Sequence, residues 1–386
     1  MWAFLVSIAY IPTIMSSAIL GRWAVIALGV PLVAPLRWDL PHWLKVSILI
    51  GLSWAAASVV IAPDKLDSLL QLFFLVLLLG VVGAASQQSS LDSALGAMCW
   101  GVGVSVAFCF LGLDGDPIVA QGTPGYAGLF YNSEVLCEFA APLAVWALVK
   151  RRWLLVAICL TPILMNNSRL SYAIVIIGAM VAFWPRAWKW RIAIMAGTAA
   201  LVSIVVYEMS IGGGRFGSAL YRISMWMLAA LTITPSGHGI GAYRAVHSAE
   251  EFAHSDAIQA LVELGIGALF FVPLAIRGLR NTEVRAEHAA FFVLCIELVV
   301  SFPLHVPGAA FMVALLAGYL ARNRPRICGV RPDGGIDLGQ NDEWACSDWS
   351  GASSRGGFRR FGIPLRRADE AISKMDPSRD CPQGAG

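Results

Sequence analysis

The sequence predicts an all-α, polytopic transmembrane helix bundle, and its composition and its apolar runs lead to this class. Hydrophobic residues make up 58% of the 386 residues, only 14% are charged, and the mean hydropathy is +0.69. A soluble domain of this length needs more polar surface to stay dispersed. Apolar runs such as 66–85 and 169–184 recur along the chain, and many are long enough to cross a bilayer. They are too many for the core of one globular domain to bury.

Hydropathy predicts about twelve spans. The second and seventh are short, and each contains a proline, Pro31 or Pro162. The predicted spans are 2–20, 23–36, 43–61, 66–85, 94–112, 133–149, 153–165, 169–184, 192–207, 256–276, 289–303 and 307–321.

The distribution of basic residues predicts the orientation of these spans, because lysine and arginine concentrate in cytoplasmic connections. With both termini inside, all the strongly basic connections fall in the cytoplasm. These connections are 150–152, 186–191, 277–285 and 322–326.

Residues 1–322 therefore form the predicted bundle, with external loops at about 113–132 and 208–255. Loops as long as the second are usually functional or disordered, and its aromatic content argues against simple disorder. We expect it to carry short helices, with 221–230 the best candidate. The polar, Gly- and Asp-rich tail 323–386 is predicted to be a disordered cytoplasmic segment.

The sequence indicates no metal site, no cofactor and no nucleic-acid partner. Its eight cysteines are scattered, without CxxC or Cys/His spacing, which favours neither zinc nor a disulfide framework. No stretch of basic and interleaved aromatic residues is typical of nucleic-acid binding.

Cationic residues on the predicted outer side are unexpected, because the orientation rule depletes them there. An anionic partner would explain them. The alternative is that they neutralise lipid headgroups or pair with Glu208, Glu250 and Glu251. These cations are Arg169, Arg215, Arg222 and Arg244, with His238, His247 and His254.

Three predicted helices begin at the outer face, at residues 133, 169 and 256. Short polar residues precede each start: Asn132, then 166–168, then His254 and Ser255. Such residues cap helix N-termini, whose free N–H groups and dipole also attract anions. Plain capping is the simpler role for most of them, and a phosphate group at the outer boundary is the functional one.

The helix from Asp256 carries a polar stripe, because Asp256, Gln259 and Glu263 share one helical face. Glu263 lies well inside the predicted span, where carboxylates usually face a cavity or a partner. Glu134 and Glu138 lie one turn apart on another span. The structural alternative for each is a protonated carboxyl that bonds to a neighbouring helix.

These segments resemble the O-antigen ligase family. The stretch 254–267 resembles the family pattern of His, a small polar residue, nine residues and Gly, although Ala268 stands where Gly, Thr or Tyr is expected. Arg222…Trp226 and the turn 235–241 resemble its arginine–tryptophan segment and glycine-rich turn. Residues 167–169 resemble its Ser-Arg helix opening. Residues 128–132 resemble its outer-loop entry, with Glu134 where related proteins usually have Asn.

The resemblance implies a metal-independent transfer of a glycan from a polyprenyl-diphosphate carrier to an acceptor at the outer face of the bacterial inner membrane. The partners are then the lipid-linked donor, a glycolipid or glycan acceptor such as lipid A-core, and membrane lipids. His254 is the expected general base, and Arg222, Arg169 and Arg215 are the expected diphosphate ligands. Glu263, His238, Asn132 and Glu134 are expected to support them.

Three alternatives stay open from the sequence. A polysaccharide polymerase of the same family has the same chemistry. A secondary transporter or flippase of a lipid-linked or anionic substrate also has about twelve spans and intramembrane carboxylates, and inverted repeats or interrupted helices are its signature. A non-catalytic scaffold leaves the outer cations unexplained.

Overall fold

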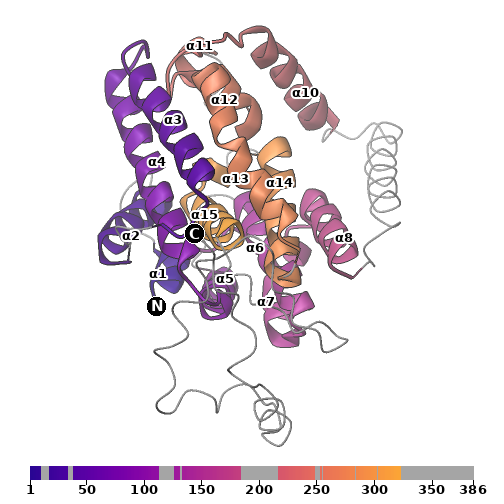
Figure 1. Ribbon diagram of the computed structural model, residues 1–386. Helices are drawn as coiled ribbons and strands as arrows, with labels where there is room; N and C mark the ends of the chain where they lie inside the picture. Colours follow the sequence, from indigo (N-terminus) through magenta and orange to yellow (C-terminus); the bar gives the residue numbers. More distant parts are fainter. Residues whose placement is uncertain are drawn as a thin grey trace, which may run out of the picture. The chain divides into compact units, whose positions relative to one another are not determined.

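The structure is a computed structural model, and it describes residues 1–9, 17–33, 38–112, 126–130, 133–183, 216–247, 253, 255–282, 284–301 and 303–322. These residues form helices and connections, with no strand among them (Figure 1). The chain divides into two compact units, Met1–Asn323 and Arg324–Gly386. The second unit, with the predicted disordered tail, lies outside the described residues.

The described helices differ widely in length. They are α1 Trp2–Ile8, α2 Ser17–Val33, α3 His42–Ser58, α4 Lys65–Ser86, α5 Asp92–Phe110, α6 Ser133–Val149, α7 Trp153–Met165, α8 Arg169–Phe183, α10 Phe216–Leu231, α11 Tyr243–Val246, α12 Asp256–Leu264, the 3₁₀ helix η2 Gly265–Phe270, α13 Val272–Arg280, α14 Arg285–Val300, the 3₁₀ helix η3 Pro303–His305 and α15 Pro307–Ala321.

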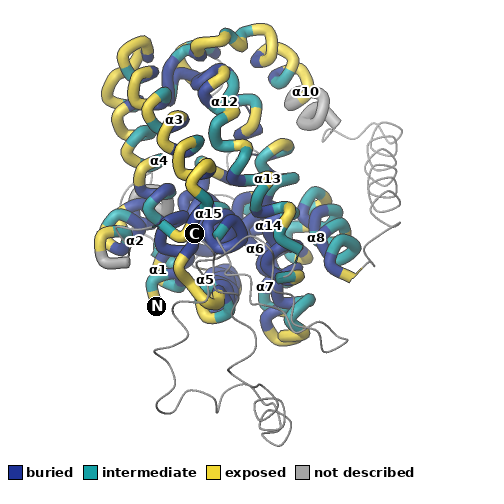
Figure 2. Tube along the Cα trace, viewed as in Figure 1, coloured by how far each residue is buried: buried dark blue, intermediate teal, exposed yellow. Residues whose placement is uncertain are grey.

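Two described helices, α4 and α5, are long and apolar enough to cross a membrane. The bent pair formed by Asp256–Phe270 and Val272–Arg280 would make a third span, while α7, α8 and α15 are shorter apolar helices. Exposed apolar side chains such as Leu49, Leu69 and Phe73 lie on α3 and α4 (Figure 2). Exposed apolar surface of this kind marks contact with lipid or with another protein. The structure thus indicates membrane association, whereas the number twelve stays a prediction.

The centre of the described bundle is formed by α6 and α15. Every residue of α6 from Val135 to Ala147 is buried, and so are most residues of α15. Helices α5, α7, α8 and α14 pack around α6, and α4, α13 and α14 pack against α15. The two helices therefore have no polar face, which is typical of buried helices.

Several predicted boundaries coincide with the structure. The spans 133–149, 153–165 and 307–321 match α6, α7 and α15, and the expected external helix 221–230 lies within α10. Helix α14 begins and ends earlier than the predicted span 289–303. It runs from Arg285 to Val300 and thus stops before Pro303. The predicted span 192–207 lies outside the described residues.

The predicted division between the first two spans is wrong. Helix α1 ends at Ile8, and α2 runs from Ser17 through Gly21 and Arg22, where the sequence predicts a break. The reason is that Arg22 is 1% exposed and bonded inside the bundle. Its guanidinium donates to the carbonyl oxygens of Val6, Ser7 and Leu129 and lies over the Phe130 ring. An arginine bonded in this way does not need a solvent-exposed connection.

The predicted span 256–276 is broken in the structure, because Asp256–Phe270 and Val272–Arg280 meet at a bend of 64°. Gly265 ends α12 with a φ of +54°, which breaks the helical path. Pro273 lies in the first turn of α13, where the missing N–H costs nothing. The two residues thus divide one apolar stretch into two helices joined by η2.

Candidate functional site

The polar stripe of α12 faces the inside of the bundle. Asp256, Gln259 and Glu263 are 3%, 5% and 8% exposed. Ser255 caps the helix, since its hydroxyl accepts a hydrogen bond from the Ile258 N–H at 3.4 Å. The cap fixes the start of the helix where the sequence predicts it, and this start sets the direction of the stripe.

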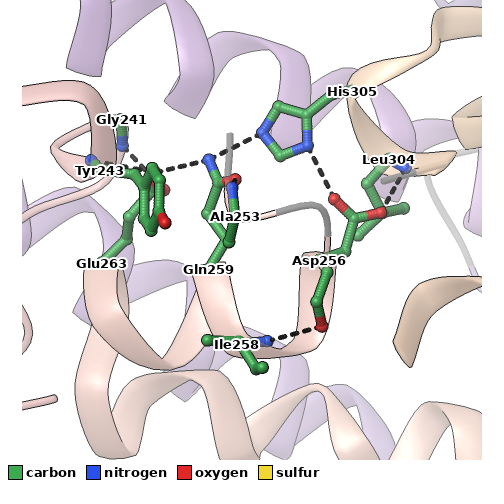
Figure 3. Close-up of polar contacts among 10 residues, drawn as sticks. Gly241, Tyr243, Ala253, Asp256, Ile258, Gln259, Glu263, Leu304 and His305 are labelled. Atoms are coloured by element: carbon green, nitrogen blue, oxygen red, sulfur yellow. Dashed lines mark hydrogen bonds and ion pairs between the residues drawn. The ribbon is translucent and has the colours of Figure 1, made fainter. Parts of the chain in front are cut away.

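A hydrogen-bonded network links the stripe to η3 (Figure 3). The Asp256 carboxylate lies 2.7 Å from Nδ1 of His305 and accepts the Leu304 N–H at 2.6 Å. Nε2 of His305 lies 3.0 Å from the amide nitrogen of Gln259. That nitrogen also donates to Glu263 at 2.9 Å. We call Asp256, His305, Gln259 and Glu263 the cavity network.

The contacts of Gln259 fix the tautomer of His305. The Ala253 N–H donates to Oε1 of Gln259, so the amide nitrogen is the atom that faces both His305 and Glu263. An amide nitrogen only donates, so Nε2 of His305 must accept. Nδ1 of His305 then carries the proton that is donated to the Asp256 carboxylate.

Glu263 connects α12 to the glycine-rich turn. The backbone N–H groups of Gly241 and Tyr243 donate to its carboxylate at 2.9 and 3.4 Å. Together with Gln259 these give Glu263 three donors, all from neutral groups. The carboxylate is thus held by an amide and two backbone N–H groups.

The turn 235–241 packs against the C-terminal end of α12. The N–H of His238 donates to Val262, that of Gly239 to Glu263, and that of Ile266 to Pro235. At Gly237 and Gly265 φ is positive, and a Cβ on either would lie less than 2.5 Å from backbone atoms of the other segment. The two glycines therefore allow the turn and α12 to approach each other closely.

The cavity network forms the polar end of an otherwise apolar cavity of about 300 Å³. Among the described lining residues, Gln71 of α4 is the one amide or charged side chain outside the network. Four aromatic rings line the walls: Trp23, Phe74, Phe271 and Phe291. An apolar cavity with a few converging polar groups is the usual form of a small-molecule site.

The expected base and diphosphate ligands can be compared with this cavity at one position, Arg169. Arg169 is the exposed first residue of α8 and does not line it. Arg222 lies on α10, but its side chain is outside the described part of the chain. His254, Arg215 and Asn132 are also outside the described residues. Their predicted convergence stays a prediction.

The expected supporting residues divide into two groups. Glu263 belongs to the cavity network. His238 does not line the cavity, because its Nε2–H donates to the carbonyl oxygen of Thr232 at 2.8 Å and ties the turn to the end of α10. Glu134 is exposed in the first turn of α6, whereas Glu138 is buried and accepts a hydrogen bond from Ser301.

His305 is the residue that the sequence reasoning missed. It lies between Pro303 and Pro307, at a short interruption of two apolar segments. A histidine at an interruption of this kind is a signal, because irregular backbone at membrane depth lines a cavity or is buried in protein. Glu297 was also missed, and it is fully buried on α14.

Comparisons with protein-family models, curated proteins and solved structures found no match to this chain. Within the described part of the chain, no group of three or more His, Cys, Asp or Glu side chains could hold a metal ion.

Proposed function

We propose that this protein is a glycosyltransferase of the O-antigen ligase type, which moves a glycan from a polyprenyl-diphosphate carrier to an acceptor outside the cytoplasmic membrane. One observation carries the proposal. The turn 235–241 and the segment 255–267, on which the resemblance depends, pack against each other at the end of one cavity. Residues so far apart in sequence serve one reaction only if the fold brings their segments together.

The proposed chemistry is a displacement at the anomeric carbon. The acceptor oxygen forms a bond to this carbon, and the bond from the carbon to the diphosphate oxygen breaks. The electron pair of that bond leaves with the lipid diphosphate. The acceptor proton passes to His254, whose unperturbed pKa of about 6.5 suits a general base.

Arginines suit the leaving group. Negative charge grows on the diphosphate as the bond breaks, and guanidinium groups stabilise phosphate oxygens with paired hydrogen bonds. Arg222 and Arg169 are the proposed ligands, and Arg215 is a third, next to Gly214 and Gly217. The aqueous ends of α8 and α10 would then face the donor.

The test is transfer by the purified full-length chain in nanodiscs, with a polyprenyl-diphosphate-linked glycan as donor. His254→Ala and Arg222→Ala should each abolish transfer. The matched controls are His42→Ala and Arg285→Ala, which alter exposed residues on other helices and should keep the wild-type rate. Wild-type transfer by the His254 or Arg222 variant would remove that residue from the mechanism. EDTA should leave the rate unchanged.

A secondary transporter is the second candidate, because one structural feature favours it. The 64° bend between η2 and α13 interrupts an apolar segment next to the buried carboxylates of α12. Interrupted helices with binding groups at the break are typical of transporters. Substrate uptake by proteoliposomes without any change in the glycan's covalent linkage would favour this candidate over transfer.

A further inference from the structure

The cavity has a charge pattern that excludes some ligands. Asp256 and Glu263 lie at its polar end, and no lysine or arginine is among the described residues that line it. His305 also lies at this end, with Nδ1 2.7 Å from the Asp256 carboxylate and Nε2 3.0 Å from the Gln259 amide nitrogen. Two carboxyl groups and one histidine thus form the polar end, a composition that disfavours a phosphate or carboxylate ligand inside a low-dielectric site.

The walls of the cavity favour a cation independently of the carboxylates. Trp23, Phe74, Phe271 and Phe291 contribute aromatic rings, and Trp23 stacks on Phe74 with ring centroids 4.1 Å apart. The faces of such rings attract organic cations, and tryptophan does so most strongly. The remaining lining is aliphatic, which suits a hydrocarbon body.

We propose that this cavity binds an amphiphilic organic cation: a protonated amine on a hydrocarbon body. Gln259 bridges two acceptors, Nε2 of His305 and Oε1 of Glu263, at 3.0 and 2.9 Å. An ammonium group carries three donors and a positive charge, so it satisfies the same two acceptors and also neutralises the carboxylate. The volume of about 300 Å³ holds roughly ten heavy atoms at ~30 Å³ each.

The proposal goes beyond glycan transfer and does not rest on it. Arg169 does not line the cavity, and Asp256 and Glu263 are neither the proposed base nor the proposed diphosphate ligands, so a variant that loses transfer can still bind the amine. Equally, the absence of amine binding would leave the proposed transfer reaction standing. The two proposals can therefore fail separately.

Three probes of equal chain length test the inference: octylamine, 1-octanol and octyl phosphate. Native mass spectrometry of the full-length protein counts how many molecules of each are retained per chain. We expect one saturable octylamine site, at least tenfold weaker retention of 1-octanol, and no saturable retention of octyl phosphate. Asp256→Asn and Glu263→Gln should each weaken octylamine binding at least tenfold, whereas Asp39→Asn, at an exposed carboxylate away from the cavity, should not.

Two further variants test the site without touching the network. Gln71→Lys places a cation in the lining and should weaken octylamine while allowing octyl phosphate to bind. Ala314→Phe fills the cavity and should weaken octylamine and 1-octanol alike. Equal or tighter binding of octyl phosphate by the wild-type protein would overturn the proposal. So would octylamine affinity that is unchanged in both folded carboxylate variants, or in Gln71→Lys.

Discussion

Two clusters of carboxylates in this protein differ in what compensates their charge. At one end of α6, Lys150 lies 2.9 Å from Asp92 and 3.1 Å from Glu287, and Arg152 lies 3.6 Å from Asp92. We call these four residues the ion-paired cluster. In the cavity network, Asp256 and Glu263 are buried like Glu287, but amide, imidazole and backbone N–H groups surround them.

The difference separates a structural role from a functional one. In the ion-paired cluster Glu287 also accepts the indole N–H of Trp146, and the lysine cation supplies the charge that a buried carboxylate requires. Burial by itself lowers the pKa of Lys150, but hydrogen bonds to Asp92 and Glu287 and their charges outweigh it, so the pKa is raised. The carboxyl groups of the cavity network have amide, imidazole and backbone N–H partners instead of a lysine, and the network adjoins an apolar cavity.

The largest effect is expected at the junction that holds the cavity network in place. In Gly265→Ala, the new Cβ would lie 2.3 Å from the Pro235 carbonyl oxygen, at a φ of +54°. Clash and backbone strain together should lower the free energy of unfolding by on the order of 4 kcal/mol. Denaturant unfolding in detergent measures it. Gly112→Ala is the control, since φ is +66° but nothing lies within 4 Å of its Cβ. Equal losses in the two variants would mean that the close approach is unimportant.

The next effect tests the ion-paired cluster. Lys150→Met leaves Glu287, which is 1% exposed, without its cation, and should cost roughly 3 kcal/mol of unfolding free energy. The double variant Lys150→Met with Glu287→Gln should recover part of the loss, because the unmatched charge is gone. Lys45→Met, at an exposed site on α3, is the control and should change little. A Lys150 variant as stable as the control would show that this cluster is not structural.

The sequence predicts the polar stripe of the cavity network better than the tertiary contacts that complete it. Helical spacing places Asp256, Gln259 and Glu263 on one face, and the high cost of a carboxylate in hydrocarbon requires that face to point inward. No local pattern reveals that His305, 42 positions after Glu263 in sequence, completes the network. Likewise, the charge of Arg22 predicts the end of an apolar span at this position. Its contacts with α1 and with residues 129–130 bury it inside the bundle instead.

A smaller effect is expected where the cavity network meets α6. The Ser301 hydroxyl donates to the buried Glu138 carboxylate at 2.7 Å, and the Ser301 carbonyl accepts the Asp256 N–H at 3.0 Å. Ser301→Ala removes only the first bond and should cost about 1–2 kcal/mol. Ser53→Ala, at an exposed position of α3, should have almost no effect. Comparable small losses in both variants would show that the hydroxyl contributes nothing beyond its backbone contact.

The smallest effect concerns pH and the loop that follows α10. His247 is buried, its Nε2 lies 3.0 Å from the Thr232 hydroxyl, and its ring packs on Tyr243. Burial lowers the pKa of His247, and the nearby charge of His238 lowers it further. Between the lowered folded pKa and the unfolded value of about 6.5, the unfolded chain binds more protons than the folded one. Stability from this group is therefore complete above about pH 6.5 and is lost as the pH falls from there through the lower folded pKa.

His247→Gln removes the titrating ring but keeps a side chain that can bond to Thr232. The wild-type protein should lose more stability than this variant between about pH 7.5 and pH 5. Hydrogen exchange at the amides of Tyr243–Val246 is the local measurement, because α11 packs on α12 and carries the Tyr243 N–H bond to Glu263. If exchange there accelerates equally on acidification in both proteins, the pH response arises in the carboxylates of the cavity network. If exchange accelerates in the wild-type protein alone, protonation of His247 opens this loop while the cavity network stays intact.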